Sequence, residues 1–347
     1  MKKTISKILL TTSILATAAP TFACSELNHN FGNDLGLYSA RTMDVFIDLQ
    51  PSLSIYPKGT KETGALDRNS LNWTDKYGYV SVDETNLHDL TAEGVNEKGL
   101  SAHLLYFGTM EQPERNANIK GVNGLAWVRY VLGNYSNVDE VIKGLGDYQI
   151  YTPQIELQGK KGNLPIHYLI EDAQGNSAII EYVNKKLTVH KNIKAMTNEP
   201  SFDKQMENLN IIKNTDLYNI DMIPGGAKSE NRFVRANFIS ENMPKASSPE
   251  EAVNYMFAAA DSVSVPFVEG YKDVDFTAEG VQDKWPTQWK SVISTQDKKL
   301  YLSDVLVGNR IYVDLNEANL EQGQPVKTIS AMNNNLAGDV TYDMSSK

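Results

Sequence analysis

The stretch Thr21-Phe-Ala-Cys24 decides how this chain is interpreted, because it ends an apolar leader and contains the only cysteine among 347 residues. Two lysines stand near the start of the chain, residues 8–19 are apolar or small, and small residues precede the cysteine. This is the pattern of a cleaved secretory signal. We therefore expect residues 1–23 to be a signal peptide, the protein to be exported to the periplasm or secreted, and the mature chain to begin at Cys24.

A cysteine at the first position of a mature chain carries two reactive groups on one residue. Its thiol, with an ordinary pKa of about 8.5, is a latent nucleophile, and its α-amine, with a pKa of about 8, is a base near neutral pH. This pairing is the N-terminal nucleophile arrangement. The same position also suits a lipid anchor, which would block the amine, although Thr21 stands where lipid-attachment signals usually have leucine. Both interpretations stay open on the leader alone.

A strand-like stretch downstream ends in an arginine and an aspartate three residues apart, Arg41-Thr-Met-Asp44. A guanidinium beside the Cys24 sulfur would favour the thiolate, and a carboxylate could hold the ammonium form of the Cys24 amine. The same spacing is also typical of a surface ion pair. Arg41 and Asp44 are therefore candidate site residues with a structural alternative.

Five motifs follow one another in a fixed order along the chain. They are Cys24 after the leader, Arg41-Thr-Met-Asp44, Asn96-Glu-Lys-Gly-Leu100, Met196-Thr-Asn198-Glu-Pro200 and Asn231-Arg-Phe-Val-Arg235. In this order the chain, from Cys24 to about Tyr312, resembles the choloylglycine hydrolases. That family of linear-amide C–N hydrolases includes bile salt hydrolases and penicillin V acylases. The resemblance implies a four-layer αββα sandwich of the N-terminal nucleophile hydrolase type, and a possible homo-oligomer, often a tetramer.

The resemblance also implies a role for each matching residue. Cys24 would attack the amide carbonyl of an N-acyl substrate and form an acyl-thioester, with its own amine as the base. Asn198 would donate a hydrogen bond to the oxyanion, although an asparagine before Glu-Pro is also typical of a turn. Tyr106 matches a second site position, and a strand aromatic in the core is an equally good interpretation of it.

Charged residues complete the site that the resemblance implies. Arg41 and Asp44 would flank the nucleophile, and Arg232 would add a second positive charge. Without the resemblance, Arg232 is typical of a helix surface. Arg235, almost one turn further on, is the alternative if the alignment shifts.

The substrate is less well defined than the bond that is cleaved. The resemblance allows conjugated bile salts, phenoxyacetyl penicillin and N-acyl homoserine lactones, each with a bulky apolar acyl part. Val45 stands where some Gram-negative relatives have tryptophan, which disfavours penicillin V because an aromatic wall is missing. Tyr106 favours penicillin V or acyl-lactone substrates. Val45 and Tyr106 thus favour different substrates, and the sequence does not indicate which of the three substrate classes is preferred.

Composition and charge exclude several other classes. The net charge is −10, and loss of the three leader lysines would make it −10 − 3 = −13, so a nucleic-acid partner is not expected. Beyond the leader, no apolar run approaches the ~20 residues of a membrane span. No Pro-, Ser- or Gly-rich linker divides residues 24–347. We expect one domain there, with a loose polar tail from about residue 333.

Strands and pairs of helices follow one another without one-to-one alternation. Turn signals predict hairpins through the first hundred residues. Caps at Ser136 or Asn137 and at Ser248 predict two of the helices. This order predicts an α+β fold of packed antiparallel sheets with helices outside. The predicted strands are 35–43, 53–56, 73–82, 100–107, 166–171, 177–183, 187–190, 291–296, 299–302 and 310–314, another strand ends at 196–198, and the predicted helices are 125–132, 138–145, 232–240 and 249–260.

Metal and cofactor motifs do not stand out in the sequence. The histidines show no spacing typical of metal ligands, and there is neither a glycine-rich phosphate loop nor a G-x-S-x-G motif. We expect no cofactor and interpret the histidines as structural or surface residues. They are His29, His88, His103, His167 and His190.

The leading hypothesis is therefore an exported cysteine amidase acting on a small-molecule N-acyl amide. A second hypothesis, from another class, is a lipid-anchored, non-catalytic binding protein with an acylated Cys24. A third is a related amidase that acts on peptide or ceramide-like amides.

Overall fold

The computed structural model describes residues 23–32, 34–87, 90–157, 160–271 and 285–346. The predicted signal peptide, apart from Ala23, lies outside these residues. Two large sheets dominate the described part of the chain.

The first sheet has seven strands and carries Cys24 on its second strand. Its neighbours are antiparallel except for the last pair, β19 and β21, which is parallel. In spatial order the strands are β16 (Ala195–Met196), β1 (Ala23–Asn30), β2 (Leu37–Asp44), β17 (Thr287–Ser294), β18 (Lys299–Asp304), β19 (Arg310–Asp314) and β21 (Gly338–Asp339).

The second sheet has nine strands, all paired antiparallel. In spatial order they are β15 (Lys186–Lys191), β14 (Ser177–Val183), β13 (Ile166–Glu171), β8 (Ser101–Tyr106), β7 (Leu90–Asn96), β6 (Tyr79–Glu84), β3 (Pro51–Tyr56), β20 (Lys327–Ser330) and β22 (Ser345–Ser346).

Helices and three small strand pairs make up the rest of the regular structure in the described residues. The helices are η1 (Gly124–Ala126), α1 (Trp127–Asn134), α2 (Val138–Gly144), α3 (Phe202–Lys213), α4 (Ser229–Asn242) and α5 (Pro249–Val263). The strand pairs are β4 (Lys61–Thr63) with β5 (Asn72–Thr74), β9 (Gly121–Asn123) with β10 (Gln149–Tyr151), and β11 (Ile155–Leu157) with β12 (Lys160–Gly162).

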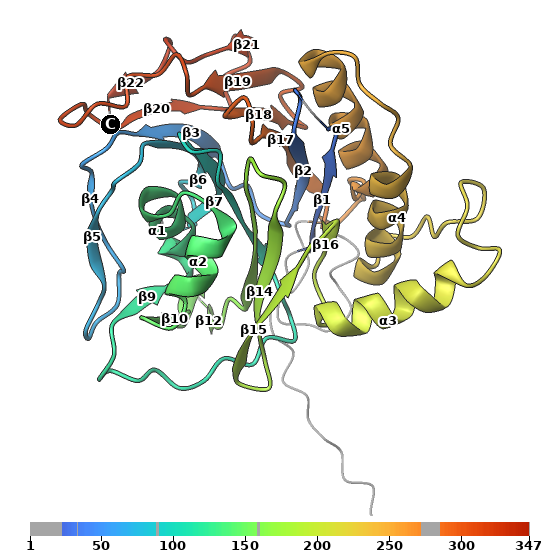
Figure 1. Cartoon of the computed structure of the whole chain (residues 1–347), viewed down its shortest axis with the longest axis horizontal. Coiled ribbons are helices and arrows are strands. Elements are labelled where there is room, and N and C mark those ends of the chain that lie inside the picture. Colours follow the sequence, from blue (N-terminus) through green and yellow to red (C-terminus); the bar gives the residue numbers. More distant parts are fainter. Residues whose placement is uncertain (1–22, 33, 88–89, 158–159, 272–284, 347) are drawn as a thin grey trace, which may run out of the picture.

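Helices cover the outer faces of both sheets. Helices α4 and α5 pack on β1 and β2 of the first sheet, whereas α1 packs on β7 and β8 of the second. Figure 1 shows α4 and α5 on the opposite side of the molecule from α1 and α2. The result is an α+β fold with four layers in the order helix, sheet, sheet, helix, as expected from the resemblance.

Burial explains why the strands carry such apolar sequences. All residues of β2, β3 and β6 are buried, because a sheet in the middle of four layers is covered on both faces. By contrast, β18 alternates between half-buried and buried residues. One apolar core contains residues of both sheets, and a second lies between the first sheet and helices α4 and α5.

Helix caps formed as the sequence predicted. The Asn137 side chain accepts a hydrogen bond from the Glu140 amide at the start of α2, and Ser248 does the same for Glu251 at the start of α5. Among the elements that the sequence did not predict are β1, β7, α3 and β20. The predicted strand 73–82 is divided, because the chain bends at residues 76–77 between β5 and β6.

The C-terminal segment differs from the loose tail expected from about residue 333. Val340 is fully buried and Met344 is 6 % exposed, and both belong to the apolar core. The Asp314 amide donates to the Thr341 hydroxyl at 3.0 Å, and β21 pairs with β19. The segment is anchored because two apolar side chains and one short strand find partners that its polar composition does not reveal.

Candidate active site

Cys24 lies at the start of β1, between β16 and β2, with 1 % of its surface exposed. Its register partner is Met43, whose Sδ lies 3.7 Å from the Cys24 Sγ. Alternate residues of a strand point to opposite faces. Cys24 belongs to the core between the sheets, whereas Leu27 belongs to the core under the helices. The thiol therefore points into the space between the two sheets.

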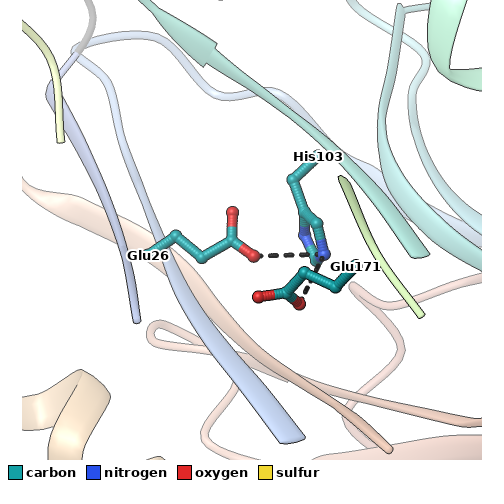
Figure 2. A group of neighbouring side chains, drawn as sticks. All are labelled: Glu26, His103 and Glu171. Atoms are coloured by element: carbon teal, nitrogen blue, oxygen red, sulfur yellow. Dashed lines mark ion pairs between the residues drawn. The ribbon is translucent and has the colours of Figure 1, made fainter. Parts of the chain in front are cut away.

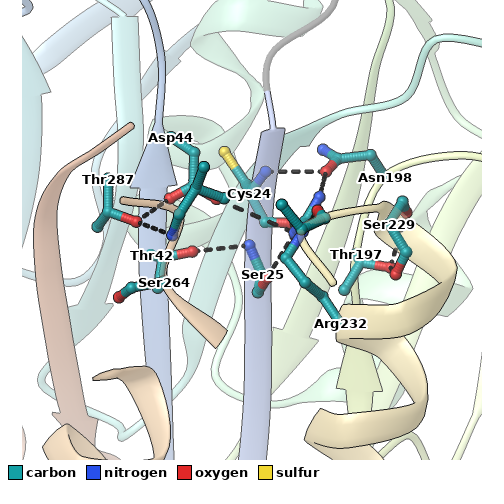
Figure 3. Close-up of polar contacts among 12 residues, drawn as sticks. Cys24, Ser25, Thr42, Asp44, Thr197, Asn198, Ser229, Arg232, Ser264 and Thr287 are labelled. Atoms are coloured by element: carbon teal, nitrogen blue, oxygen red, sulfur yellow. Dashed lines mark hydrogen bonds and ion pairs between the residues drawn. The ribbon is translucent and has the colours of Figure 1, made fainter. Parts of the chain in front are cut away.

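Polar groups from distant parts of the chain bond both main-chain groups of Cys24 (Figure 3). The Cys24 nitrogen donates to Asn198 Oδ1 at 2.9 Å. The Cys24 carbonyl accepts from Arg232 Nη1 at 2.6 Å, and the same guanidinium donates through Nη2 to Asn198 Oδ1 at 2.8 Å. The Cys24 nitrogen, Asn198 and Arg232 thus form one buried hydrogen-bond network around the first residue of the predicted mature chain.

Asn198 is held in place on all sides. Its Nδ2 donates to the Tyr106 carbonyl at 2.9 Å, and its own carbonyl accepts from Gln205 Nε2 at 2.9 Å. Gln205 belongs to α3, so the helix that the sequence did not predict helps to position this residue. The amide nitrogen of Asn198 has two hydrogens. One hydrogen is used in the bond to the Tyr106 carbonyl, so the Nδ2 group has a second hydrogen for another acceptor.

Arg232, and not Arg235, is the arginine of α4 that reaches the site. Arg232 is 1 % exposed, and its Nε donates to the Ala227 carbonyl at 2.7 Å, which fixes the guanidinium plane. Arg235 instead donates to the carbonyls of Ser262 and Pro224, away from Cys24. The expectation of a helix-surface arginine was wrong for Arg232, because it points inward to β1.

Asp44 lies beside this network without being the partner of the Cys24 nitrogen. Its Oδ1 accepts from Thr287 Oγ1 at 2.6 Å, and its Oδ2 lies 4.0 Å from Arg232 Nη1. Burial raises the pKa of Asp44 to about 6, although Arg232 and the bond from Thr287 favour the ionised form. The sequence suggested that Asp44 holds the amine; in the structure the oxygen bonded to that nitrogen is Asn198 Oδ1.

The Arg41 side chain extends from β2 toward the second sheet, and its guanidinium lies beside the Cys24 sulfur. Its Nη2 lies 4.0 Å from Cys24 Sγ and donates to the Leu104 carbonyl at 2.6 Å. Its Nη1 pairs with Glu93 Oε2 at 3.2 Å, and its guanidinium lies 5.1 Å from the Trp289 ring. The alternative of a surface ion pair with Asp44 was wrong, because Arg41 is 1 % exposed and pairs with Glu93.

The Cys24 thiol stays in its protonated form in this environment. Burial raises the pKa of Cys24, and the charge of Asp44 raises it further. Arg41 acts in the opposite direction but does not outweigh burial. Attack by the sulfur therefore requires a base that removes its proton.

An apolar pocket opens directly beside the sulfur. Tyr106, at the end of β8, is 1 % exposed and forms part of its wall. Burial raises the pKa of this phenol far above its ordinary value, so it stays neutral. Val45 is fully buried elsewhere, with its carbonyl bonded to Gln288. The pocket is lined by Cys24, Arg41, Met43, Leu49, Leu87, Leu90, Leu104, Tyr106, Leu164 and Ile166.

All six sequence-predicted site residues meet around Cys24, and the structure adds others that the sequence did not indicate. Ser25 Oγ accepts from Arg232 Nη1 at 2.5 Å, and Thr287 bonds Asp44. Thr287 comes from a strand 243 residues further along the chain. The aliphatic pocket residues come from separate loops and strands. No local sequence motif indicates that these residues contact one another.

Comparison with known proteins agrees with this geometry. The sequence pattern of the linear amide C–N hydrolases, choloylglycine hydrolase family, matches residues 24–328. A penicillin V acylase from Pectobacterium atrosepticum is 31 % identical over 300 residues, which cover 81 % of this chain and 77 % of that protein. A bile salt hydrolase/transferase from Clostridium perfringens is 27 % identical over 319 residues, 83 % of this chain and 91 % of that protein.

A solved structure extends the similarity to three dimensions. The penicillin V acylase from Agrobacterium tumefaciens superposes with a TM-score of 0.81 at 27 % identity, covering 93 % of this chain and 98 % of that structure. The matched segment includes the strand that begins with Cys24, the Asn198 motif and Arg232. The chain therefore belongs to the choloylglycine hydrolase family and is a hydrolase of linear amide C–N bonds.

Proposed function

We propose that this protein is an exported cysteine amidase that begins at Cys24 and cleaves small-molecule N-acyl amides through an acyl-thioester. The proposal rests mainly on one observation: the nitrogen, the carbonyl and the sulfur of Cys24 each have a different side chain beside them. Asn198 bonds the nitrogen, Arg232 bonds the carbonyl, and Arg41 lies beside the sulfur. The family pattern also starts at residue 24, which supports removal of residues 1–23.

Cleavage after Ala23 would convert the Cys24 nitrogen from a peptide nitrogen into an α-amine. The free amine then takes the proton of its own thiol, directly or through one water, and the sulfur attacks the substrate carbonyl carbon. The C=O π electrons move onto oxygen, and the second Nδ2 hydrogen of Asn198 stabilises this oxyanion.

Collapse of the tetrahedral intermediate breaks the C–N bond. The α-ammonium returns its proton to the leaving nitrogen, which departs as an amine, and the acyl group remains on Cys24 as a thioester. Water then attacks the thioester carbonyl and gives a proton to the α-amine, which passes it to the departing sulfur. The products are a carboxylic acid, an amine and the original thiol.

The pocket indicates the part of the substrate that is buried. Its lining is aliphatic apart from Cys24, Arg41 and the Tyr106 ring, which suits an apolar group and not a charged one. The cavity has a volume of only about 20 Å³, so a bulky acyl group would have to displace part of this lining. Conjugated bile salts, penicillin V and N-acyl homoserine lactones all present an amide carbonyl next to such a group. Peptide or ceramide-like amides form the third substrate class to be tested.

The lipid-anchored alternative conflicts with the position of the sulfur. A diacylglyceryl thioether on Sγ would have to occupy the interior between two sheets, where Cys24 is 1 % exposed. In the described part of the chain, no helix is long and apolar enough to cross a membrane.

The test combines the intact mass of the purified protein with turnover of Cys24→Ser. We expect a mass that starts at an unmodified Cys24, hydrolysis of at least one substrate class, and a loss of at least about 1,000-fold in kcat for the variant. The control is Ser54→Ala, which removes a hydroxyl that bonds Thr328 on β20, outside the site. An acylated Cys24, or full activity in Cys24→Ser, would refute the proposal.

A further inference from the structure

Behind Cys24, the space between the two sheets holds a buried group of charged side chains. Glu26 follows Cys24 on the same face of β1, Glu93 comes from β7, His103 from β8 and Glu171 from β13. Each is at most 1 % exposed. Figure 2 shows the Glu26 and Glu171 carboxylates approaching the His103 ring from two different sides.

Three ligand-type atoms converge at one point in this group. His103 Nε2 lies 3.1 Å from Glu26 Oε1 and 3.7 Å from Glu171 Oε2. The donor atoms of the three residues all lie within 4.8 Å of one another. Nitrogen and oxygen ligands lie about 2.0–2.2 Å from Zn²⁺, so neighbouring ligands on one ion are about 3–3.6 Å apart. The two separations to Nε2 are close to this range.

Two of the three converging atoms lack a hydrogen bond in the described residues. Within the described ranges, neither carboxylate oxygen of Glu26 nor His103 Nε2 has a hydrogen-bond partner. The 3.1 Å separation of His103 Nε2 from Glu26 Oε1 is an ion-pair distance, but it does not have the geometry of a hydrogen bond. Buried polar atoms without partners are costly, so their convergence calls for a ligand.

The surrounding contacts match those that orient metal ligands. His103 Nδ1 lies 3.1 Å from Glu93 Oε2, so the other ring nitrogen has a carboxylate partner. Glu171 accepts from Asn28 Nδ2 at 2.5 Å and from Ser101 Oγ at 3.4 Å. A carboxylate behind a ligating histidine, and hydrogen bonds to a ligating carboxylate, are the usual supports of a protein metal site.

Charge balance is consistent with a divalent ion. Three ionised glutamates, Arg41 and one divalent cation sum to −3 + 1 + 2 = 0 when His103 is neutral. Protonation of both His103 and Glu26 would also give neutrality, −2 + 1 + 1 = 0. Cation and protons therefore compete for one site, as they do at metal sites generally.

We infer that Glu26, His103 and Glu171 form a buried binding site for a divalent transition-metal cation of the Zn²⁺ type. One nitrogen and two carboxylate ligands suit such an ion. The ion joins β1, the strand of the nucleophile, to β8 and β13 of the other sheet. The sequence did not reveal this site because its ligands come from three distant strands.

The test measures metal uptake in the full-length expressed and processed protein. The protein is unfolded with a chelator and refolded with Zn²⁺ or with Co²⁺, and bound metal is counted by mass spectrometry after gel filtration. We expect about one ion per chain and, for Co²⁺, visible d–d absorption. Glu26→Gln and His103→Asn are expected to lower the bound metal by about tenfold or more.

His167→Asn is the matched control. His167 is 2 % exposed and its Nδ1 lies 3.4 Å from Glu181, so it is a second buried histidine–glutamate pair, outside the proposed site. This variant is expected to keep its metal. If His103→Asn does not fold, Glu26→Gln still tests the metal site, because glutamine has the same size as glutamate.

Two results would overturn the inference. The first is a natively folded wild-type protein, by circular dichroism, that takes up less than about one-tenth of an ion per chain. The group would then be a proton-holding ion cluster. The second is metal binding that Glu26→Gln leaves unchanged, which would place the ion elsewhere. Neither result bears on the amidase proposal, because the readout is metal content and not turnover.

Discussion

At the scale of single residues, function depends on how Cys24 is surrounded. Asn198 Oδ1 accepts from both the Cys24 nitrogen and Arg232, so one asparagine links the nucleophile to the positive charge. Its Nδ2 is held by the Tyr106 carbonyl, which leaves the side chain a single orientation. Pre-oriented donors of this kind stabilise charge that develops in the transition state.

Replacing Asn198 by Ala is expected to lower kcat by about 100- to 1,000-fold, because the proposed oxyanion donor and the partner of the Cys24 nitrogen are both lost. Steady-state kinetics on the substrate found for the wild type would measure this. Asn237→Ala is the control, since Asn237 is buried and its Nδ2 bonds the Phe233 carbonyl within α4. An equal loss in both variants would point to a general folding defect.

Asp44 makes stability depend on pH. Its pKa is about 6 in the folded chain against an ordinary 3.8. A carboxyl with a raised folded pKa stabilises the fold fully below its unfolded pKa, and this contribution is lost as pH rises through the folded pKa. From pH 4 to 7, the wild type is expected to lose about 2 kcal/mol relative to Asp44→Asn.

Urea unfolding of both proteins across this range tests the prediction. The difference between them at each pH cancels the titration of other groups. Curves that stay parallel from pH 4 to 7 would contradict a raised Asp44 pKa.

At the scale of elements, β1 and α4 bring the site together. The β1–β2 register places Cys24 opposite Met43 and Ala23 opposite Asp44, so the Arg41 motif lies beside the nucleophile. Helix α4 packs on β1 and presents Arg232 to the Cys24 carbonyl. Two elements far apart in the sequence thus define the charged wall of the site.

Two arginines on α4 allow a matched comparison. In Arg232→Lys, one ammonium replaces a planar guanidinium that bonds three partners near Cys24, and we expect kcat to fall about tenfold or more. Arg235→Lys is expected to keep most of the activity, because Arg235 bonds the Ser262 and Pro224 carbonyls. The reverse order of effects would show that Arg235 is the site residue.

At the scale of the whole molecule, the site depends on two sheets facing each other. The sulfur, Arg41 and the pocket all lie between them, and the charged group around His103 lies there as well. The C-terminal segment adds a short strand to each sheet, β21 to the first and β22 to the second. A homo-tetramer stays a prediction from family resemblance, which light scattering would check.

The buried end of the chain gives a stability prediction. Val340→Ala removes two methyl groups from the core, where Val340 is fully buried. We expect a loss of about 1–3 kcal/mol in the free energy of unfolding. Asn334→Ala, on an exposed residue of the same segment, is expected to stay within about 0.5 kcal/mol of the wild type. Equal stability of the two variants would support the loose tail that the sequence predicted.

The sequence by itself determined the family, the class of bond that is hydrolysed and most of the local structure. Cys24 after a leader, with four ordered motifs behind it, was sufficient for the family, and caps such as Asn137 and Ser248 determined helix starts, because these signals are local. The α+β class followed from the order of the elements. All six predicted site residues also meet in the structure.

Only the tertiary structure decided which atoms meet. The bond from the Cys24 nitrogen to Asn198, the inward position of Arg232 and the partner of Asp44 on β17 join residues 174 to 243 positions apart. The convergence of Glu26, His103 and Glu171 is of the same kind. Such contacts depend on strand register and on how the two sheets face each other, and no local pattern of residues encodes that geometry.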